Sequence, residues 1–243
     1  MSFFEHTFTA GFRDTGKSNK LTNKAFLSFM EDSGGLHSEK AGFGMNQIES
    51  TGLSWILLGW KLKVLSRPTY GTEVKVITWG RDFSKVHAFR DFEVYDDKNN
   101  LIAIGTSKWV LFNIKTNRLS RITPEVINSY GMESKLVFTS DEDDFSIGNV
   151  PSKLLNSFNY TILRNNIDIN NHMHNLYYLD LAYEALPEDV YRNSDLNNVE
   201  IIYKKECSLG NEIKCDYYFE NDVHYVYIKS PDDSILHAVV KLY

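Results

Sequence analysis

One short stretch gathers most of the side chains in this sequence that could do chemistry. Residues 168–175 read Asp-Ile-Asn-Asn-His-Met-His-Asn, so a carboxylate, two imidazoles and three amides lie within eight residues. A carboxylate and an imidazole can move protons near neutral pH. Single residues of these types most often form turns or helix caps. A cap needs only one such side chain, so the combination favours a site for attack on a carbonyl group.

An amphipathic helix is predicted directly after this stretch. Leu176, Leu179, Tyr183 and Leu186 recur at helical spacing, which indicates that one face of the helix is buried. The unpaired N–H groups and the dipole at a helix start favour negative charge. We therefore expect the helix start after His172 to donate hydrogen bonds to an oxygen that becomes negative during reaction.

The composition indicates a soluble globular protein with a large core. The chain has 243 residues, of which 42% are hydrophobic and 14% aromatic, and its formal net charge is −6. Aromatic residues favour strands, and the negative charge argues against non-specific nucleic-acid binding. The two cysteines, Cys207 and Cys215, lack partners at zinc-finger spacing, and the N-terminus does not resemble a signal peptide. We expect a cytoplasmic protein without metal, cofactor or membrane insertion.

Two copies of one unit are predicted, each containing a helix and antiparallel strands. The first copy should have a strand at 6–13, a helix from Thr22 to about Ser33 that Gly34-Gly35 interrupts, and strands at 53–66, 72–82, 85–95 and 101–113. The second should have a strand at 158–162, the polar stretch with its helix, and strands at about 198–207, 211–220, 223–229 and 235–242. Residues 71–76 match residues 210–215, and Asp14 precedes the first helix as Asp168 precedes the second. The pattern indicates a duplication.

The repeat divides the chain into residues 1–127, a linker or crossover over 128–151, and residues 152–243. Four acids fall in residues 140–144, and Leu136-Val137-Phe138 is an apolar patch that we expect to tether the linker to a surface. The fold class is predicted as α+β, with a curved antiparallel sheet wrapped around a central helix in each half.

These residues resemble those of the acyl-ACP thioesterases, plant and bacterial enzymes that release fatty acids from acyl carrier protein. Residues 168–172 are similar to the family's Asp-x-Asn-x-His run, and Glu206-Cys207 is similar to its Glu-Cys pair, 35 residues beyond His172 (207 − 172). The family usually has two asparagines where this chain has His174 and Asn175, and we expect His174 to cap the helix. The resemblance implies a tandem (double) hot-dog fold and hydrolysis of fatty acyl-ACP to free fatty acid, which ends chain elongation.

The resemblance also implies catalytic roles for Asp168, Asn170, His172, Glu206 and Cys207. Asp168 would act as general base on water or attack directly to give a mixed anhydride, while Asn170 orients the substrate or water. His172 would assist proton transfer, and Glu206 would orient it or hold water.

Cys207 is the alternative nucleophile, because Cys, His and Asn can form a papain-like set. A predicted strand position beside Glu206 would raise the pKa of the thiol and would turn the two side chains to opposite faces. We therefore favour the carboxylate mechanism, with a supporting role for Cys207.

Residues 15–19, which follow Asp14 in the first copy, contain no histidine, so the resemblance implies that this copy holds most of the acyl tunnel. The candidate wall residues are Phe26, Phe29, Met30, Leu53, Trp55 and Leu57. Each of them taken alone is more commonly an ordinary core residue. A pocket is lined by core-like residues, so the sequence does not separate the two interpretations.

The expected partner is acyl carrier protein carrying a fatty acyl chain. That carrier is acidic, so we expect basic edges formed by Lys17, Lys20 and Lys24, and by Arg81 and Lys85. The alternatives are an acyl-CoA thioesterase, a non-catalytic acyl-binding sensor and a hot-dog dehydratase. The chain is expected to be a monomer or a homodimer.

Overall fold

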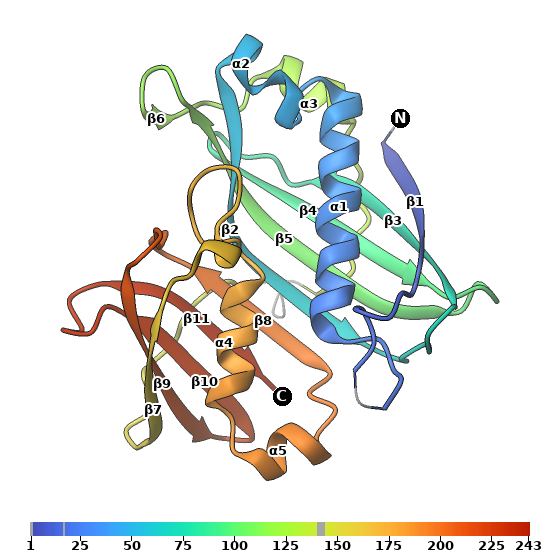
Figure 1. Cartoon of the computed structure of the whole chain (residues 1–243). Coiled ribbons are helices and arrows are strands. Elements are labelled where there is room, and N and C mark those ends of the chain that lie inside the picture. The colour runs from blue at the N-terminus through green and yellow to red at the C-terminus, as the bar shows by residue number, and fades with distance from the viewer. Residues whose placement is uncertain (1, 17, 140–143) are drawn as a thin grey trace. The chain divides into compact units, whose positions relative to one another are not determined.

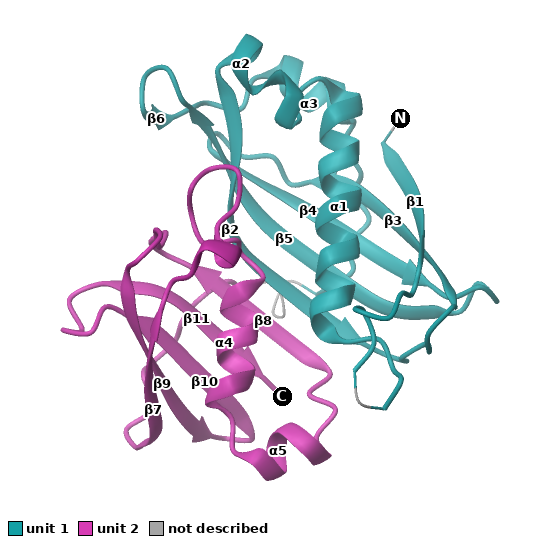
Figure 2. Ribbon diagram, viewed as in Figure 1, with its two compact units in different colours: residues 1–144 teal, residues 145–243 magenta. Residues whose placement is uncertain are grey.

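The chain forms two compact units in the computed structural model, which describes residues 2–16, 18–139 and 144–243. Unit 1 comprises Met1–Asp144 and unit 2 comprises Phe145–Tyr243 (Figure 2). In each unit one helix lies across a face of an antiparallel sheet, α1 (Asn23–Ala41) in unit 1 and α4 (Tyr177–Ala185) in unit 2 (Figure 1). The predicted unit of helix and sheet is therefore confirmed in both halves.

The sheet of unit 1 has the strand order β1-β3-β4-β5-β2, with β6 paired to β5. Its strands are β1 (Phe3–Thr9), β2 (Leu53–Val64), β3 (Glu73–Arg81), β4 (His87–Tyr95), β5 (Leu101–Asn113) and β6 (Arg118–Leu119). The shorter helices are η1 (Met45–Gln47), α2 (Ile48–Thr51) and α3 (Pro124–Tyr130). The long strands after the helix lie where the sequence predicts them, whereas β1 begins earlier than expected.

The sheet of unit 2 has the strand order β8-β11-β10-β9-β7. Its elements are β7 (Leu154–Thr161), η2 (Arg164–Asn166), α5 (Glu188–Asn193), β8 (Asn198–Tyr203), β9 (Glu212–Glu220), β10 (Val223–Lys229) and β11 (Leu236–Leu242), besides α4. Read from the outer strand, β7-β9-β10-β11-β8 repeats β1-β3-β4-β5-β2 of unit 1 strand for strand. The two halves share one topology, as the sequence repeat predicts.

Helix α1 begins where the sequence predicts and ends later. The hydroxyl of Thr22 accepts a hydrogen bond from the N–H of Ala25 at 3.1 Å, which confirms the predicted cap. The predicted end near Ser33 is wrong, because α1 continues to Ala41 and stops at Gly42, whose φ of 84° is left-handed. The helix passes through Gly34 because its buried face packs on the sheet, and that packing outweighs the roughly 1 kcal/mol cost of a helical glycine.

The core of unit 1 lies between α1 and the sheet. Phe26, Leu27 and Met30 have no exposed surface. Gly105 on β5 gives Met30 its space, since a Cβ there would lie 2.6 Å from the methionine sulfur. Burying side chains of this size stabilises the unit by about 1.5–3 kcal/mol each.

The chain that follows α3 (Pro124–Tyr130) is bound to the sheet face that points away from α1. Helix α3 spans the expected domain end at residue 127, and the following chain donates from Glu133 N to Gly80 O at 3.1 Å and from Val137 N to Asp91 Oδ2 at 3.1 Å. Phe138 is buried while Leu136 is exposed, so the predicted tether is formed by part of the apolar patch. The acidic residues 140–143 lie outside the described residues.

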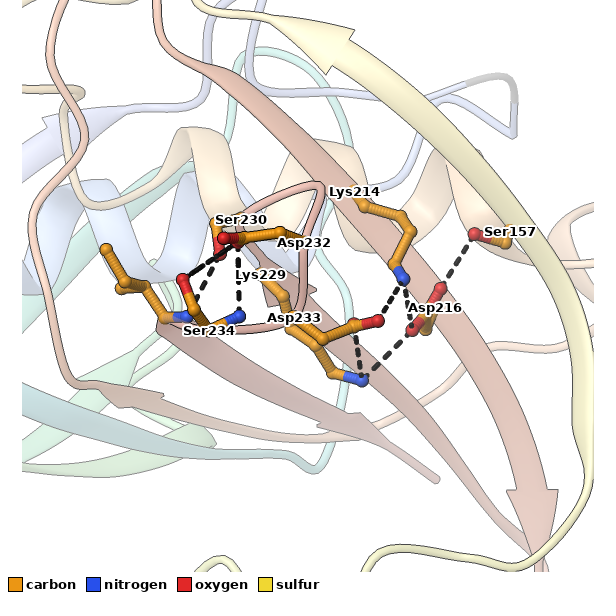
Figure 3. Close-up of polar contacts among 9 residues, drawn as sticks. Ser157, Lys214, Asp216, Lys229, Ser230, Asp232, Asp233 and Ser234 are labelled. Atoms are coloured by element: carbon orange, nitrogen blue, oxygen red, sulfur yellow. Dashed lines mark hydrogen bonds and ion pairs between the residues drawn. The ribbon is translucent and has the colours of Figure 1, made fainter.

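In unit 2 the sheet face away from α4 carries a network of alternating charges (Figure 3). Lys229 lies 3.0 Å from Asp216, Lys214 lies 2.8 Å from Asp233, and the Ser157 hydroxyl donates to Asp216 at 2.7 Å. The network therefore ties β7, β9 and β10 to the turn before β11. Because each of the two lysines is paired with an aspartate, this face offers little net positive charge to an acidic partner.

Thr22→Ala should lower the free energy of unfolding by about 1 kcal/mol, because the first turn of α1 loses its side-chain acceptor. Chemical denaturation followed by circular dichroism measures the change. Thr22→Ser keeps the hydroxyl and is the matched control. A Thr22→Ala protein as stable as Thr22→Ser would contradict the assigned cap.

Candidate active site

The polar stretch forms a tight turn organised by Asp168. The Asp168 N–H donates to His172 O at 2.8 Å, and the Asn171 N–H donates to Asp168 O at 3.1 Å. Carboxylate oxygen Oδ1 accepts from the N–H groups of Asn170 at 2.8 Å and His172 at 3.2 Å. Asn171 has a φ of 62°, a left-handed conformation that asparagine tolerates well. The second carboxylate oxygen makes only a long contact, 3.4 Å to the Asn170 amide.

Backbone contacts hold this turn against the Glu206-Cys207 segment. Met173 N–H donates to Cys207 O at 2.8 Å, and His172 forms an isolated β-bridge with Ser208. The His174 N–H donates to Asn166 O at 2.8 Å and closes the base of the turn. The structure thus brings together the two motifs that lie 35 residues apart in sequence.

Unit 1 contains the same backbone arrangement without the chemical groups. The bridges Thr15 with Leu21 and Lys20 with Thr69 repeat those of Ile167 with Met173 and His172 with Ser208. The bonds from Gly16 N to Lys20 O and from Leu21 N to Pro68 O likewise repeat the bonds that Asp168 and Met173 make. Four positions of unit 1 are therefore equivalent to positions of unit 2: Gly16 to Asp168, Lys20 to His172, Pro68 to Cys207, and Asp14 to Asn166.

Two conclusions follow from this equivalence. The expected match of Asp14 to Asp168 is wrong, because Asp14 takes the position of Asn166 and Gly16 that of Asp168. The turn also forms in unit 1 with Gly16 and Lys20, so the scaffold itself does not require Asp168 or His172. Their presence in unit 2 needs another explanation.

Glu206 and Cys207 do not lie on a strand. The predicted strand at 198–207 ends at Tyr203, because the N–H groups of Lys204 and Lys205 both donate to His237 O and the chain leaves the ladder there. The alternation argument therefore does not apply, yet the two side chains still diverge. Cys207 is fully buried and the Glu206 side chain is 52% exposed.

Glu206 is an ionised carboxylate beside the histidine turn. A hydrogen bond from its own backbone N–H is the main cause that lowers the pKa of its carboxyl group. Burial opposes this effect, and the nearby charges of Lys205 and His172 lower the pKa further. The Lys205 ammonium lies 3.6 Å away. Glu206 is therefore ionised at neutral pH and can act as a hydrogen-bond acceptor for His172.

Cys207 is a poor nucleophile in this environment. Burial raises the pKa of its thiol to about 11, the Glu206 charge adds to the shift, and a hydrogen bond from the Tyr178 hydroxyl opposes it. The expected direction is therefore confirmed, although burial rather than Glu206 is the main cause. Tyr178 on α4 is a neighbour that sequence reasoning missed, since helical spacing marks it only as a buried aromatic.

Most backbone N–H groups near the predicted helix start already have acceptors, so they cannot donate to an oxyanion as the sequence predicts. Helix α4 begins at Tyr177, and the N–H groups of residues 172, 173, 174, 176, 177 and 178 all have acceptors. His174 Nδ1 accepts from the Leu176 N–H at 3.3 Å, within the turn before the helix. In the described part of the chain no side chain caps α4 itself, so the predicted capping role of His174 is wrong. Within residues 172–178, only the Asn175 N–H has no acceptor among the described residues.

The six candidate tunnel residues fall into separate groups in unit 1. Phe26 and Met30 are buried under the sheet-facing side of α1, while Phe29 stacks on Phe8 of β1 at 4.5 Å. Leu53 and Trp55 pack on a cluster around Tyr130, whose hydroxyl accepts from the Trp55 indole at 2.8 Å, and Leu57 is buried further along β2. Their role as tunnel walls stays a prediction.

The expected basic edges need one correction. Arg81 is 2% exposed and binds Asp91 at 2.8 Å beneath the sheet surface, so it cannot contribute to a carrier-binding surface. Lys20 and Lys85 are exposed and Lys24 is partly exposed. Lys17 lies outside the described residues.

Unit 2 also has a cavity of about 570 Å³ between β7, α4 and the segment before the turn. Its lining residues are Phe158, Tyr160, Asn165, Asn166, Met173, Tyr177, Asp180, Leu181 and Glu184. None of the five catalytic candidates lines it. Within the described ranges no three His, Cys, Asp or Glu side chains gather as metal ligands, and no helix there is long and apolar enough to cross a membrane.

Solved structures share this fold over nearly the whole chain. An acyl-ACP thioesterase from Bacteroides thetaiotaomicron aligns with a TM-score of 0.84 and 18% identity, covering 99% of this chain and 96% of the other. The 12:0-ACP thioesterase from Umbellularia californica aligns with a TM-score of 0.86 and 21% identity over 99% and 96%. The chain therefore has the tandem hot-dog fold of these thioesterases, as predicted.

Family models extend this likeness to the sequence. Residues 2–130 match the acyl-ACP thioesterase N-terminal domain, and residues 152–234 match the C-terminal domain. The protein belongs to the acyl-ACP thioesterase family. The chloroplastic oleoyl-acyl carrier protein thioesterase 1 of Arabidopsis thaliana is 23% identical over 220 residues, which cover 84% of this chain and 60% of the relative. The chain thus spans about 60% of the length of such a curated relative.

Both thiols should react slowly with a disulfide reagent at pH 8 in the native protein. Cys207 and Cys215 are buried, and burial raises the pKa of the thiols to about 11 and about 12. A pKa of about 11 leaves only about one thiol in 10³ ionised at pH 8. Absorbance of the released reagent measures the rate, and unfolded protein gives the full rate.

Cys207→Ala identifies which thiol reacts. A Cys207 that reacts in the native protein as fast as in unfolded protein would contradict the buried, protonated state assigned to it.

Proposed function

We propose that this protein hydrolyses the thioester of fatty acyl-[acyl carrier protein] and releases the free fatty acid. Membership of the family and the shared fold support the reaction class. The observation that carries the proposal is the comparison of the two turns. The same backbone frame holds Gly16 and Lys20 in unit 1 but Asp168 and His172 in unit 2, so unit 2 carries acid–base groups that its scaffold does not need.

In this proposal Asp168 supplies the carboxylate that drives the attack. One oxygen, Oδ1, is occupied by backbone N–H groups, which leaves Oδ2 to take a proton from water or to attack the carbonyl carbon itself. Asn170 orients the water or substrate with its amide. The carbon–sulfur bond then breaks and the carrier's thiol leaves.

His172 and Glu206 serve proton transfer to the leaving thiolate. The histidine turn lies against the Glu206 segment, and Glu206 remains ionised there, so an imidazolium formed during reaction has a negative neighbour. The free N–H of Asn175 is the donor that we assign to the developing oxyanion. Cys207 supports the turn through its carbonyl oxygen rather than attacking.

The acyl carrier protein is the proposed partner, with the chain acting in the cytoplasm as a monomer or homodimer. Exposed Lys20 and Lys85 support contact with an acidic carrier. The two free cysteines are compatible with a reducing compartment.

Asp168→Asn should lower kcat by about 10²- to 10⁴-fold, because it removes the carboxylate but keeps the oxygen that accepts the N–H bonds of the turn. Fatty acid release from a panel of acyl-ACPs of different lengths measures the effect. Circular dichroism checks the fold. Asp168→Ala, which loses the acceptor as well, is the structural control.

The outcomes separate the possibilities. Asp168→Asn with wild-type turnover would reduce Asp168 to a turn residue and contradict the mechanism. If the wild-type protein binds acyl-ACP but releases no fatty acid, it is an acyl-binding sensor and not an enzyme. Faster turnover of acyl-CoA than of acyl-ACP would identify the protein as an acyl-CoA thioesterase. Cys207→Ala should keep substantial turnover, and complete loss in a folded variant would make the thiol the nucleophile.

Raising the salt concentration should raise KM for acyl-ACP and leave kcat unchanged, because screening weakens carrier binding but not the chemical step. Initial rates between low and physiological ionic strength measure both constants. The matching acyl-pantetheine has no charged carrier and should show a constant KM. A KM for acyl-ACP that does not change with salt would contradict the basic surface.

A further inference from the structure

Unit 1 buries a cation whose partners are all neutral. Arg90 on β4 is 7% exposed, and its Nη1 donates to Nδ1 of His37 at 2.9 Å and to the Thr78 hydroxyl at 3.2 Å. The guanidinium also lies 5.5 Å from the centre of the Tyr130 ring. Within the described ranges Arg90 forms no salt bridge with a carboxylate, and the only charged or aromatic group that acts on its pKa is Tyr130. Burial lowers the pKa of Arg90 to about 10, so it still carries its charge at pH 7.

The other buried arginine of this sheet, Arg81, is paired with acidic side chains. Arg81 is buried on the opposite face and binds the carboxylates of Asp91 at 2.8 Å and Asp82 at 2.6 Å. A buried charge is normally neutralised in this way. Arg90 differs because the helix-facing side holds no acid within its reach among the described residues.

A buried donor without an acceptor lies in the same row of the sheet. Arg90 and Trp60 both pair with Ser107, so the three residues face α1 side by side from β4, β2 and β5. Trp60 is fully buried, and its indole N–H has no hydrogen-bond partner. The Ser107 hydroxyl between them accepts from the Trp109 indole at 2.7 Å.

The surroundings of this row are apolar and aromatic. The Trp60 ring lies 5.3 Å from Phe92 and 6.5 Å from Trp109. Gly34 of α1 makes room for the Arg90 side chain itself, since a Cβ at that position would lie 3.3 Å from the arginine Cδ. Aromatic walls with a few fixed donors are typical of small-molecule sites.

We propose that the helix-facing row of Arg90, Ser107 and Trp60 is a subsite for a carboxylate at the distal end of the acyl chain. The inference rests on the proposed function, in which unit 1 holds that chain. The preferred substrate class is then an ω-carboxyacyl thioester. A carboxylate has two acceptor oxygens for a guanidinium and an indole N–H, and its charge neutralises the buried cation. A saturated chain would leave the Arg90 charge without a counter-ion and the Trp60 N–H without an acceptor.

The test compares pairs of acyl-ACPs of equal length, one saturated and one carrying an ω-carboxylate. The wild-type kcat/KM should be at least about tenfold higher for the ω-carboxylate member, as expected for a charged hydrogen-bonded pair. Arg90→Met removes the charge and should abolish or reverse the preference, and Arg90→Lys should restore part of it. Trp60→Phe keeps the ring, removes the N–H and should weaken the preference if Arg90→Met does not fold.

A binding measurement separates this subsite from the thioesterase activity. Calorimetry with a free dicarboxylic acid and the monocarboxylic acid of equal length should show tighter binding of the dicarboxylic acid by wild type and equal binding by Arg90→Met. That result without hydrolysis of any acyl-ACP would support the subsite and overturn the proposed function. Hydrolysis of saturated acyl-ACPs with no ω-carboxylate preference and equal binding of the two acids would overturn the subsite and leave the proposed function intact.

Discussion

The site in unit 2 depends on a backbone contact, the hydrogen bond from Met173 N to Cys207 O together with the neighbouring bridge of His172 with Ser208. The two segments carry the acid–base candidates but are separated in sequence by α4, α5 and β8. Because main-chain groups make the connection, the side chains of His172 and Glu206 are not consumed by it. In unit 1 the same connection, from Leu21 N to Pro68 O, holds residues with no acid–base role. Duplication thus preserved the frame of this turn, and the turns of the two halves are distinguished by their side chains.

The departure of the chain from β8 decides which group can act. Lys204 and Lys205 donate to one carbonyl oxygen, that of His237, and this shared acceptor ends the ladder at Tyr203. The following residues turn so that Cys207 is buried against Tyr178 while Glu206 is exposed beside His172. Burial suppresses the thiolate, and exposure keeps the carboxylate charged. A backbone irregularity therefore favours carboxylate chemistry over thiol chemistry at adjacent positions.

Sequence patterns predict the parts of this structure that depend on periodicity. Alternation located β2 to β5, and the matching segments 71–76 and 210–215 predicted the duplication. They could not predict that α1 passes Gly34, because helix packing, not local propensity, decides that. The burial of Arg81 needed its partner Asp91, which is on another strand, and the equivalence of Gly16 with Asp168 needed hydrogen bonds rather than residue types. Motif spacing placed Glu206 near His172, and strand alternation predicted that the side chains of Glu206 and Cys207 diverge. They do diverge, but not for that reason, because neither residue lies on a strand.

Several residues in the interior of unit 1 lower the free energy of unfolding, so stability does not explain their presence. An arginine buried with neutral partners carries a desolvation penalty of several kcal/mol, and a glycine inside a helix costs about 1 kcal/mol more than alanine. Both occur at one place, where Gly34 leaves room for Arg90. The unpaired Trp60 N–H adds about 1–3 kcal/mol in the same row. An apolar side chain at position 90 and alanine at position 34 would make a more stable helix-on-sheet core. Ligand binding therefore explains Arg90 and Gly34 better than a role in stability does.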